Sequence, residues 1–303
     1  MRSSLDRATL VKTLAAAMVV ALFPLIAQAA EKPLIRWVAS PWAPNWITEG
    51  PLKGSGYGDR MQKLVQEALP GFSHETVWTS APRINRNLLG DEQACFASGF
   101  YRLSDPETGR LHEKLVWSAP IYLFYWHGLI MLKETRDRLP AGSSLSLARV
   151  IRDPSLTLAI DRGRDYGADL NPIVAQYRDA AHVLEVGSDK NLKAHQYRLL
   201  LRGRVDYVID YSYMLGFAEG ELGQPGRFTF VPLSDHATLH GLGAILCNNS
   251  DQGRAVIAAL NRQLVSLRRT EAFRRINADW FMLEGREAEF WRLWEEELMS
   301  RAE

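Results

Sequence analysis

Segments typical of β-strands alternate with segments typical of α-helices along most of the chain, and this alternation limits the possible fold more than any other feature. Residues 34–40 (LIRWVAS) predict a strand, and an aromatic, proline-rich loop follows it. Asp59 is placed to cap an amphipathic helix that Pro70 and Gly71 end, and residues 94–101 (ACFASGFY) predict a further strand. Such repetition favours a mainly parallel sheet with helices on its faces.

The same pattern then starts again in the middle of the chain. After an apolar stretch and a polar turn, helix and strand signals alternate up to the strand GRVDYVIDYSYM, residues 203–214, which carries two carboxylates and three tyrosines. Two more strands, at 228–233 and 241–249, precede two helices within 253–281. Two α/β units and a return segment imply two lobes, and ligands of such folds bind in the cleft beyond the strand ends.

The first 30 residues have the composition of a secretory signal peptide. Three basic residues come first, an apolar run of 14 residues follows, and Ala27-Gln28-Ala29 offers small residues for cleavage. The alternative is a membrane anchor, but a spanning helix needs roughly 20 apolar residues. We therefore expect a cleaved signal peptide, residues 1–30, and an exported mature chain without a membrane span.

The net charge limits the possible partners of the mature chain, and the cysteine content limits its disulfides. Without residues 1–30, 33 Lys and Arg stand against 34 Asp and Glu, so electrostatics predicts neither nucleic acid nor an anionic membrane as partner. Cys95 and Cys247 are the two cysteines of the chain. In an exported protein they could form one disulfide, or remain as two buried thiols.

Several motifs, taken in their order, resemble those of the bacterial extracellular solute-binding proteins of family 3. GYGD (56–59) begins the first helix, and WSAPIY (117–122) is similar to the Phe-Ser-x-Pro-Tyr stretch of that family. GRVDYVI (203–209) is similar to its Gly-Arg-hydrophobic-Asp strand, and residues 260–281 are similar to its closing helices. The resemblance covers nearly the whole mature chain.

This resemblance implies the two-lobed type 2 periplasmic binding protein fold, with mixed sheets flanked by helices, a hinge and an interlobe cleft. One lobe is expected from residues 31–127 and 232–303, and the other from 128–231. In that arrangement the third strand and the return strand share a sheet, so the resemblance predicts a disulfide between Cys95 and Cys247.

Amino-acid binders of the family hold the ligand carboxylate with an arginine that precedes the Phe-Ser motif, because a guanidinium matches two carboxylate oxygens. Arg102 and Arg110 lie in the corresponding stretch. Arg110 is favoured by the motif, although it comes one residue early, and Arg102 by its position just after a strand. Either arginine could serve, or both could be solvated loop residues.

The family's second recognition element is an acid five residues after the Asp of the Gly-Arg-x-Asp strand, which accepts from the ligand ammonium. Tyr211 occupies that position, five residues after Asp206, and Asp210 comes one residue early. Because a one-residue shift along a strand turns a side chain to the opposite face, Asp210 does not simply inherit this role. Asp210 and Tyr211 therefore compete for the ligand-facing position.

Other ligand-binding candidates follow from their position at strand ends. Trp42 and Trp46 lie in the loop after the first strand, where they could stack on a planar ligand or pack in a lobe. Arg164 and Tyr166 lie in a loop that leads into a helix, where backbone N–H groups favour anions.

The C-terminal tail, residues 289–301, predicts an amphipathic helix with Phe290, Trp291, Leu293, Trp294 and Leu298 on its apolar face. Packing of this face on a lobe is favoured over binding to a membrane or a partner.

Three functions remain open. The first is a monomeric periplasmic solute-binding protein that closes on a small polar ligand, amino-acid-like or another organic ion, and delivers it to an ABC permease or a sensor. The second is a dehydratase-like enzyme on the same fold with Asp210 as acid or base, and the third is a clamp for another exported protein. For the first function the motifs predict no catalytic residue, cofactor or metal.

Overall fold

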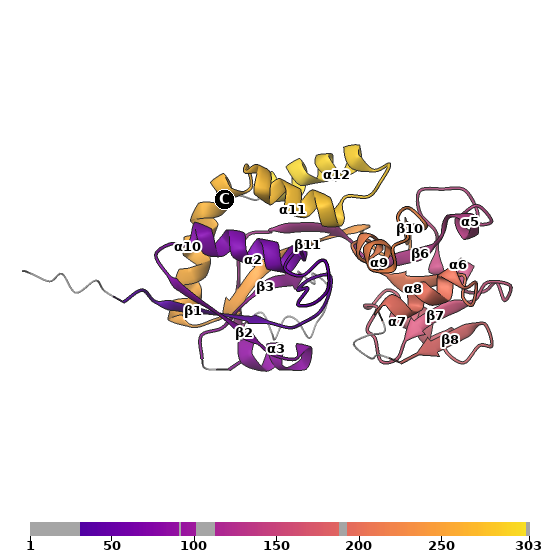
Figure 1. Cartoon of the computed structure of the whole chain (residues 1–303), viewed down its shortest axis with the longest axis horizontal. Helices are drawn as coiled ribbons and strands as arrows, with labels where there is room; N and C mark the ends of the chain where they lie inside the picture. Colours follow the sequence, from indigo (N-terminus) through magenta and orange to yellow (C-terminus); the bar gives the residue numbers. More distant parts are fainter. Residues whose placement is uncertain (1–30, 91, 101–112, 188–192, 301–303) are drawn as a thin grey trace, which may run out of the picture. The chain divides into compact units, whose positions relative to one another are not determined.

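Two mixed β-sheets, each flanked by helices, make up the part of the chain that the computed structural model describes (Figure 1). It describes residues 31–90, 92–100, 113–187 and 193–300. From Leu34 onward the chain forms one compact unit. The predicted α/β fold with mixed sheets is thereby confirmed.

The first sheet has the strand order β2-β1-β3-β11-β4, and β5 pairs with another part of β11. Strands β1, β2 and β3 are parallel, whereas β11 is antiparallel to β3, β4 and β5. The strands are β1 Leu34–Ala39, β2 Ser73–Trp78, β3 Cys95–Phe100, β4 Leu115–Trp117, β5 Tyr122–Tyr125 and β11 His240–Asn248.

Helices cover both faces of this sheet. In Figure 1, α2, α10 and α11 lie together above it, and α3 lies against β1 and β3 on the other side. Their apolar stripes bury a core that includes Trp37, Val65, Leu260 and Phe273. These helices are α2 Tyr57–Ala68, α3 Ala81–Leu88, α10 Asp251–Leu267 and α11 Glu271–Phe281.

The second sheet has the order β10-β6-β9-β7-β8. Strand β9 is parallel to β7 and antiparallel to β6, so the strand that carries Asp210 lies in the middle of the sheet. The strands are β6 Gly128–Leu132, β7 Leu158–Asp161, β8 Val183–Val186, β9 Tyr207–Asp210 and β10 Phe228–Pro232. The helices are α5 Lys133–Arg136, α6 Leu147–Val150, α7 Asn171–Tyr177, α8 Lys193–Leu201 and α9 Met214–Leu222.

The chain passes between the two sheets twice. Trp126 and His127 connect β5 of the first sheet to β6 of the second, and residues 233–239 connect β10 to β11. The second sheet is thus inserted between β5 and β11, two strands of the first sheet that pair with each other.

The two cysteines lie opposite each other on neighbouring strands. Cys95 of β3 and Cys247 of β11 are paired in the antiparallel register, with Cα atoms 4.0 Å apart, and their sulfur atoms are bonded. The predicted disulfide is confirmed, and it closes a sequence separation of 152 residues inside one sheet.

Asp59 does not hold the cap position that the sequence predicts. Gly56, three residues earlier, is the cap residue, and helix α2 begins at Tyr57. The Asp59 carboxylate instead accepts the backbone N–H groups of Ile47 at 2.8 Å and Gly56 at 3.2 Å. The helix begins early because Gly56 and Gly58 allow the chain to approach Asn45. A Cβ on Gly56 would lie 2.3 Å from the Asn45 carbonyl oxygen.

The C-terminal tail packs on the first sheet's helices, as the sequence predicts. It forms α12 Glu287–Leu293 and a π-helix, η1 Trp294–Met299. Phe290, Trp294 and Leu298 are buried, and the buried Arg268 of the preceding segment donates to the Leu298 carbonyl. No helix among the described residues is long and apolar enough to cross a membrane.

Candidate functional site

The two carboxylates of the GRVDYVID strand have different surroundings. Asp206 accepts the Thr157 N–H at 2.8 Å and pairs with Arg138 at 2.5 Å, and so fastens the start of β9 beside β7. Asp210, at the carboxyl end of β9, is 4% exposed and accepts from the Tyr197 hydroxyl at 3.1 Å and the Tyr211 N–H at 2.9 Å. Asp206 is therefore structural, while Asp210 belongs to a buried polar cluster.

Arg164 neutralises this cluster. Its guanidinium lies 2.5 Å from the Asp210 carboxylate and 3.0 Å from that of Asp161, the last residue of β7. The pKa of Arg164 is influenced most by burial, which lowers it, but the two aspartates and Tyr166 outweigh this effect and raise it well above its usual value. Arg164 is thus a permanent cation between two carboxylates.

Aromatic rings enclose the guanidinium. Arg164 lies over the rings of Tyr166 and Tyr211, 5.3 Å and 6.0 Å from their centroids. The buried Tyr166 hydroxyl accepts the Asp161 N–H, so this ring is held in place by β7. The predicted residues Arg164, Tyr166, Asp210 and Tyr211 are therefore brought together at one end of the second sheet.

His127, at the first crossing between the sheets, completes this end of the second sheet. Its ring lies against that of Tyr211, with centroids 3.9 Å apart and planes tilted by 31°, and meets Tyr166 edge-on at 5.6 Å. Burial, assisted by the charge of Arg164, lowers the pKa of His127 well below its usual value. His127 is consequently neutral at physiological pH.

Two tyrosines that follow β9 reach residues of the first sheet and its helices. Tyr211 and Tyr213 stack with an interplanar angle of 11°. Tyr213 also contacts Tyr57 at the start of α2, at 5.4 Å, and Phe281 at the end of α11, at 5.7 Å. Tyr211 meets Phe124 of β5 edge-on at 6.2 Å. Aromatic side chains from both sheets thus form one cluster.

This region holds the buried hydroxyl groups of Tyr57, Ser98 and Tyr213. None of the three makes a hydrogen bond of standard distance and angle to a described residue. Burial raises the pKa of Tyr57, and the hydroxyls of Ser98 and Tyr213 oppose this rise, so the three groups lie close together. Buried hydroxyl groups are normally satisfied by protein or water. The three hydroxyls therefore form a small polar group inside the aromatic cluster.

The remaining predicted site residues do not join the cluster. Trp46 is 2% exposed and packs against Phe96 in the core, whereas Trp42 is 40% exposed. Of the two alternatives for Trp46, the structure shows packing: the turn that links Trp42 to Trp46 directs its ring into the sheet's core. Arg102 and Arg110 lie outside the described residues.

Sequence reasoning missed His127, Tyr197 and Tyr213 as members of the cluster. His127 lies between two apolar strands, and this position at a crossing is the signal that could have identified it. Tyr197 lies in the middle of α8, where its pattern is that of a core residue. Its contact with Asp210 follows from the packing of α8 on the sheet.

Comparisons with known proteins identify the fold. Neither the models of protein families nor the curated protein sequences include a match. Among solved structures, the chain is similar to an ancestral cationic amino acid solute-binding protein, with a TM-score of 0.59 and 15% identity over 82% of this chain and 96% of that one.

Two further solved structures agree. A probable amino-acid ABC transporter extracellular-binding protein from Bacillus subtilis has a TM-score of 0.58 and 10% identity over 83% of this chain and 98% of that one. A histidine kinase sensor domain with similarity to periplasmic binding proteins has a TM-score of 0.54 and 15% identity, over 82% and 96%. The chain therefore has the two-lobed α/β fold of the type 2 periplasmic binding proteins.

Proposed function

We propose that this chain is an exported solute-binding protein that closes on a small polar ligand, amino-acid-like or another organic ion. We place the lobes at residues 31–127 with 232–303 and at 128–231. Residues 1–30 are proposed to direct export to the periplasm. An ABC permease or a sensor would receive the monomeric loaded protein, because the similar structures include both an ABC transporter binding protein and a kinase sensor domain.

The observation that carries this proposal is the cluster of buried aromatic and hydroxyl groups that both sheets supply. Tyr57 and Ser98 come from the first sheet and its helix, and Tyr211 and Tyr213 follow β9 of the second. A ligand held by groups from both lobes stabilises the closed arrangement of a hinged protein. Aromatic rings and a few polar groups are also the usual lining of small-molecule sites.

The charges of the cluster favour Tyr211 over Asp210 as the ligand-facing residue. The Asp210 carboxylate already accepts from Arg164, Tyr197 and a backbone N–H, so an ammonium group would have to compete with an arginine. Tyr211 presents its ring to aromatic residues of both sheets. We therefore propose a ligand that is bound by stacking and hydroxyl contacts, with Arg102 or Arg110 as its anion partner.

Thermal-shift screening of the mature protein tests the proposal with amino acids, polyamines, aromatic acids and small sugars. A ligand should raise the melting temperature by mass action. The shift should disappear in Tyr211→Ala and persist in Tyr177→Phe, which changes a partly buried tyrosine of α7 outside the cluster. Arg102→Ala and Arg110→Ala then identify the anion partner.

The same screen separates the alternatives. If a stabilising compound is converted and the conversion stops in Asp210→Asn, the protein is an enzyme of the dehydratase-like type. If no compound stabilises it and another exported protein co-purifies, the clamp function replaces solute binding.

A further inference from the structure

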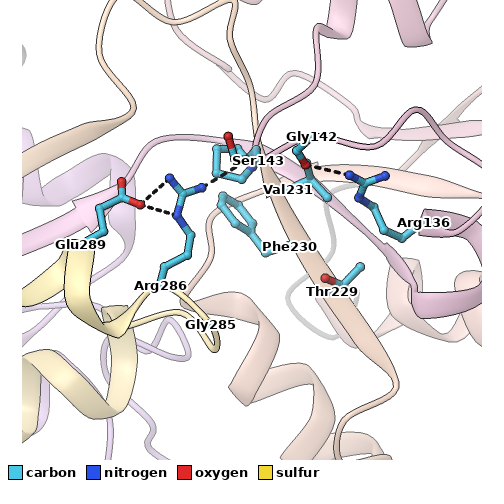
Figure 2. A pocket seen from close by; sticks show the side chains of 10 residues that line it. Arg136, Gly142, Ser143, Thr229, Phe230, Val231, Gly285, Arg286 and Glu289 are labelled. Atoms are coloured by element: carbon cyan, nitrogen blue, oxygen red, sulfur yellow. Dashed lines mark hydrogen bonds and ion pairs between the residues drawn. The ribbon is translucent and has the colours of Figure 1, made fainter.

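A pocket lies away from the aromatic cluster, between the edge of the second sheet and the C-terminal segment (Figure 2). Its volume is about 450 Å³, which is within the range of small-molecule sites. Residues that line it include Arg136, Ser143, Phe230, Val231, Arg286 and Glu289. None of these residues takes part in the proposed solute site.

Arg286 forms one wall and is held rigidly. Figure 2 shows its guanidinium bonded to Glu289 and to the loop at Ser143. The Nε and Nη2 atoms lie 2.7 Å and 2.6 Å from the Glu289 carboxylate, and Nη1 lies 3.1 Å from the Ser143 carbonyl oxygen. The same guanidinium lies 5.2 Å from the centroid of the Tyr125 ring. Two of its five N–H groups are not used by these bonds.

Arg136 forms another wall and is held by backbone carbonyls. It donates to Pro140 at 2.9 Å and to Gly142 at 2.8 Å, with a longer contact of 3.5 Å to Leu139. These three bonds also leave two of its five N–H groups for a ligand. Both arginines are therefore fixed before a ligand arrives, which reduces the entropy cost of binding.

The pocket combines this positive charge with an apolar surface. In the view of Figure 2, the Phe230 ring lies between the two arginines, and Val231 and Pro232 continue the apolar wall. Two arginines and one glutamate give the lining a formal charge of +1. One carboxylate would neutralise this charge, and a flat apolar body would cover the Phe230 ring.

We propose that this pocket is a second ligand site, which binds a small organic carboxylate through Arg136 and Arg286 with its apolar body on Phe230. The site is independent of the proposed solute site. It depends on the C-terminal segment, which follows the helices that resemble the closing helices of the family and supplies Arg286 and Glu289.

Nuclear magnetic resonance titration of the mature protein with benzoate tests this site. Benzamide, a neutral compound of the same shape, and inorganic phosphate are the comparison probes. Benzoate should give intermolecular Overhauser contacts to Phe230 and bind at least tenfold more tightly than either probe. This wild-type result does not depend on the folding of any variant.

Variants then assign the arginines. Arg286→Gln and Arg136→Gln should each weaken benzoate binding about tenfold, which corresponds to about 1.4 kcal/mol. Arg292→Gln, in the helix α12 that follows Arg286 but outside the pocket lining, and Tyr211→Ala should leave it unchanged. Benzamide binding as tightly as benzoate, phosphate binding as tightly as benzoate, or benzoate binding unchanged in both arginine variants would each overturn the proposal.

Discussion

The Arg164 guanidinium and the Asp210 carboxylate form an ion pair at the end of the second sheet, with 2.5 Å between Nη2 and Oδ1. Asp210 is almost fully buried, and Tyr197 bonds its second oxygen. In the proposed site, a ligand ammonium group would have to compete with Arg164 for the Asp210 carboxylate. The pair also creates a buried charge network whose parts depend on one another.

Removal of Arg164 should destabilise the fold. Arg164→Met leaves the buried Asp210 carboxylate without its cation, which we expect to lower the free energy of unfolding by roughly 3 kcal/mol. Urea denaturation at neutral pH measures this change. Arg162→Met, two residues away and mostly exposed in its pair with Glu185, should change it by less than about 1 kcal/mol. Equal effects of the two substitutions would contradict the importance of the buried pair.

Stability should depend on pH through His127. Burial and Arg164 lower its native pKa, whereas the unfolded chain has a pKa of about 6.5. As the pH falls below about 6.5, His127 is protonated in the unfolded chain before it is protonated in the folded one. The stability contributed by neutral His127 is therefore complete above about pH 6.5 and decreases as the pH falls toward the native pKa. His127→Gln should reduce the slope between pH 6.5 and pH 5 by up to about 1.4 kcal/mol per pH unit. Parallel stability curves for the two proteins would exclude this role.

The Cys95–Cys247 bond should be complete in the exported protein. Alkylation of denatured, unreduced protein should add nothing to its mass, and prior reduction should allow two additions. The double variant Cys95→Ala, Cys247→Ala removes the constraint on a separation of 152 residues, and we expect a loss of roughly 4 kcal/mol in unfolding free energy. Alkylation of both thiols without reduction would disprove the bond.

Arg268 should hold the C-terminal tail to the first sheet. Its buried guanidinium donates to the carbonyls of Pro120 and Leu298, which lie in segments far apart in the sequence. Arg268→Met leaves these buried carbonyls without that donor and should cost roughly 3 kcal/mol of unfolding free energy. The exposed neighbour Arg269→Met should change stability by at most about 0.5 kcal/mol. Thermal or urea denaturation of both variants makes the comparison.

The local sequence was sufficient for most of the elements. Apolar periodicity predicted the strands at 34–40 and 94–101 and the amphipathic tail, because these patterns reflect which side chains face a core. The start of α2 was predicted three residues late. Asp59 is a good cap residue, yet the close approach of Gly56 to Asn45 set the beginning of the helix. Asn45 lies in the preceding loop, outside the residue pattern of the helix itself.

The candidate site was predictable only in part. Arg164, Tyr166, Asp210 and Tyr211 were found because they follow strands, and the carboxyl ends of neighbouring strands meet at one edge of a sheet. For Trp46 the sequence allowed stacking on a ligand or packing in a lobe, and the residue is buried in the core. The ends of strands limit which residues can line a site, but the direction of a loop side chain depends on the packing around it.

The sequence by itself determined the α/β class, the two cysteines that could pair, and the strand that carries Asp210 and Tyr211, since these follow from residue spacing. Only the tertiary structure decided that Arg164 neutralises Asp210 and that Tyr211 and Tyr213 meet rings of the first sheet. The physical reason is that ion pairing and ring contacts require atoms within a few ångströms. Residues separated by tens of positions reach such distances only when the sheets and helices have packed.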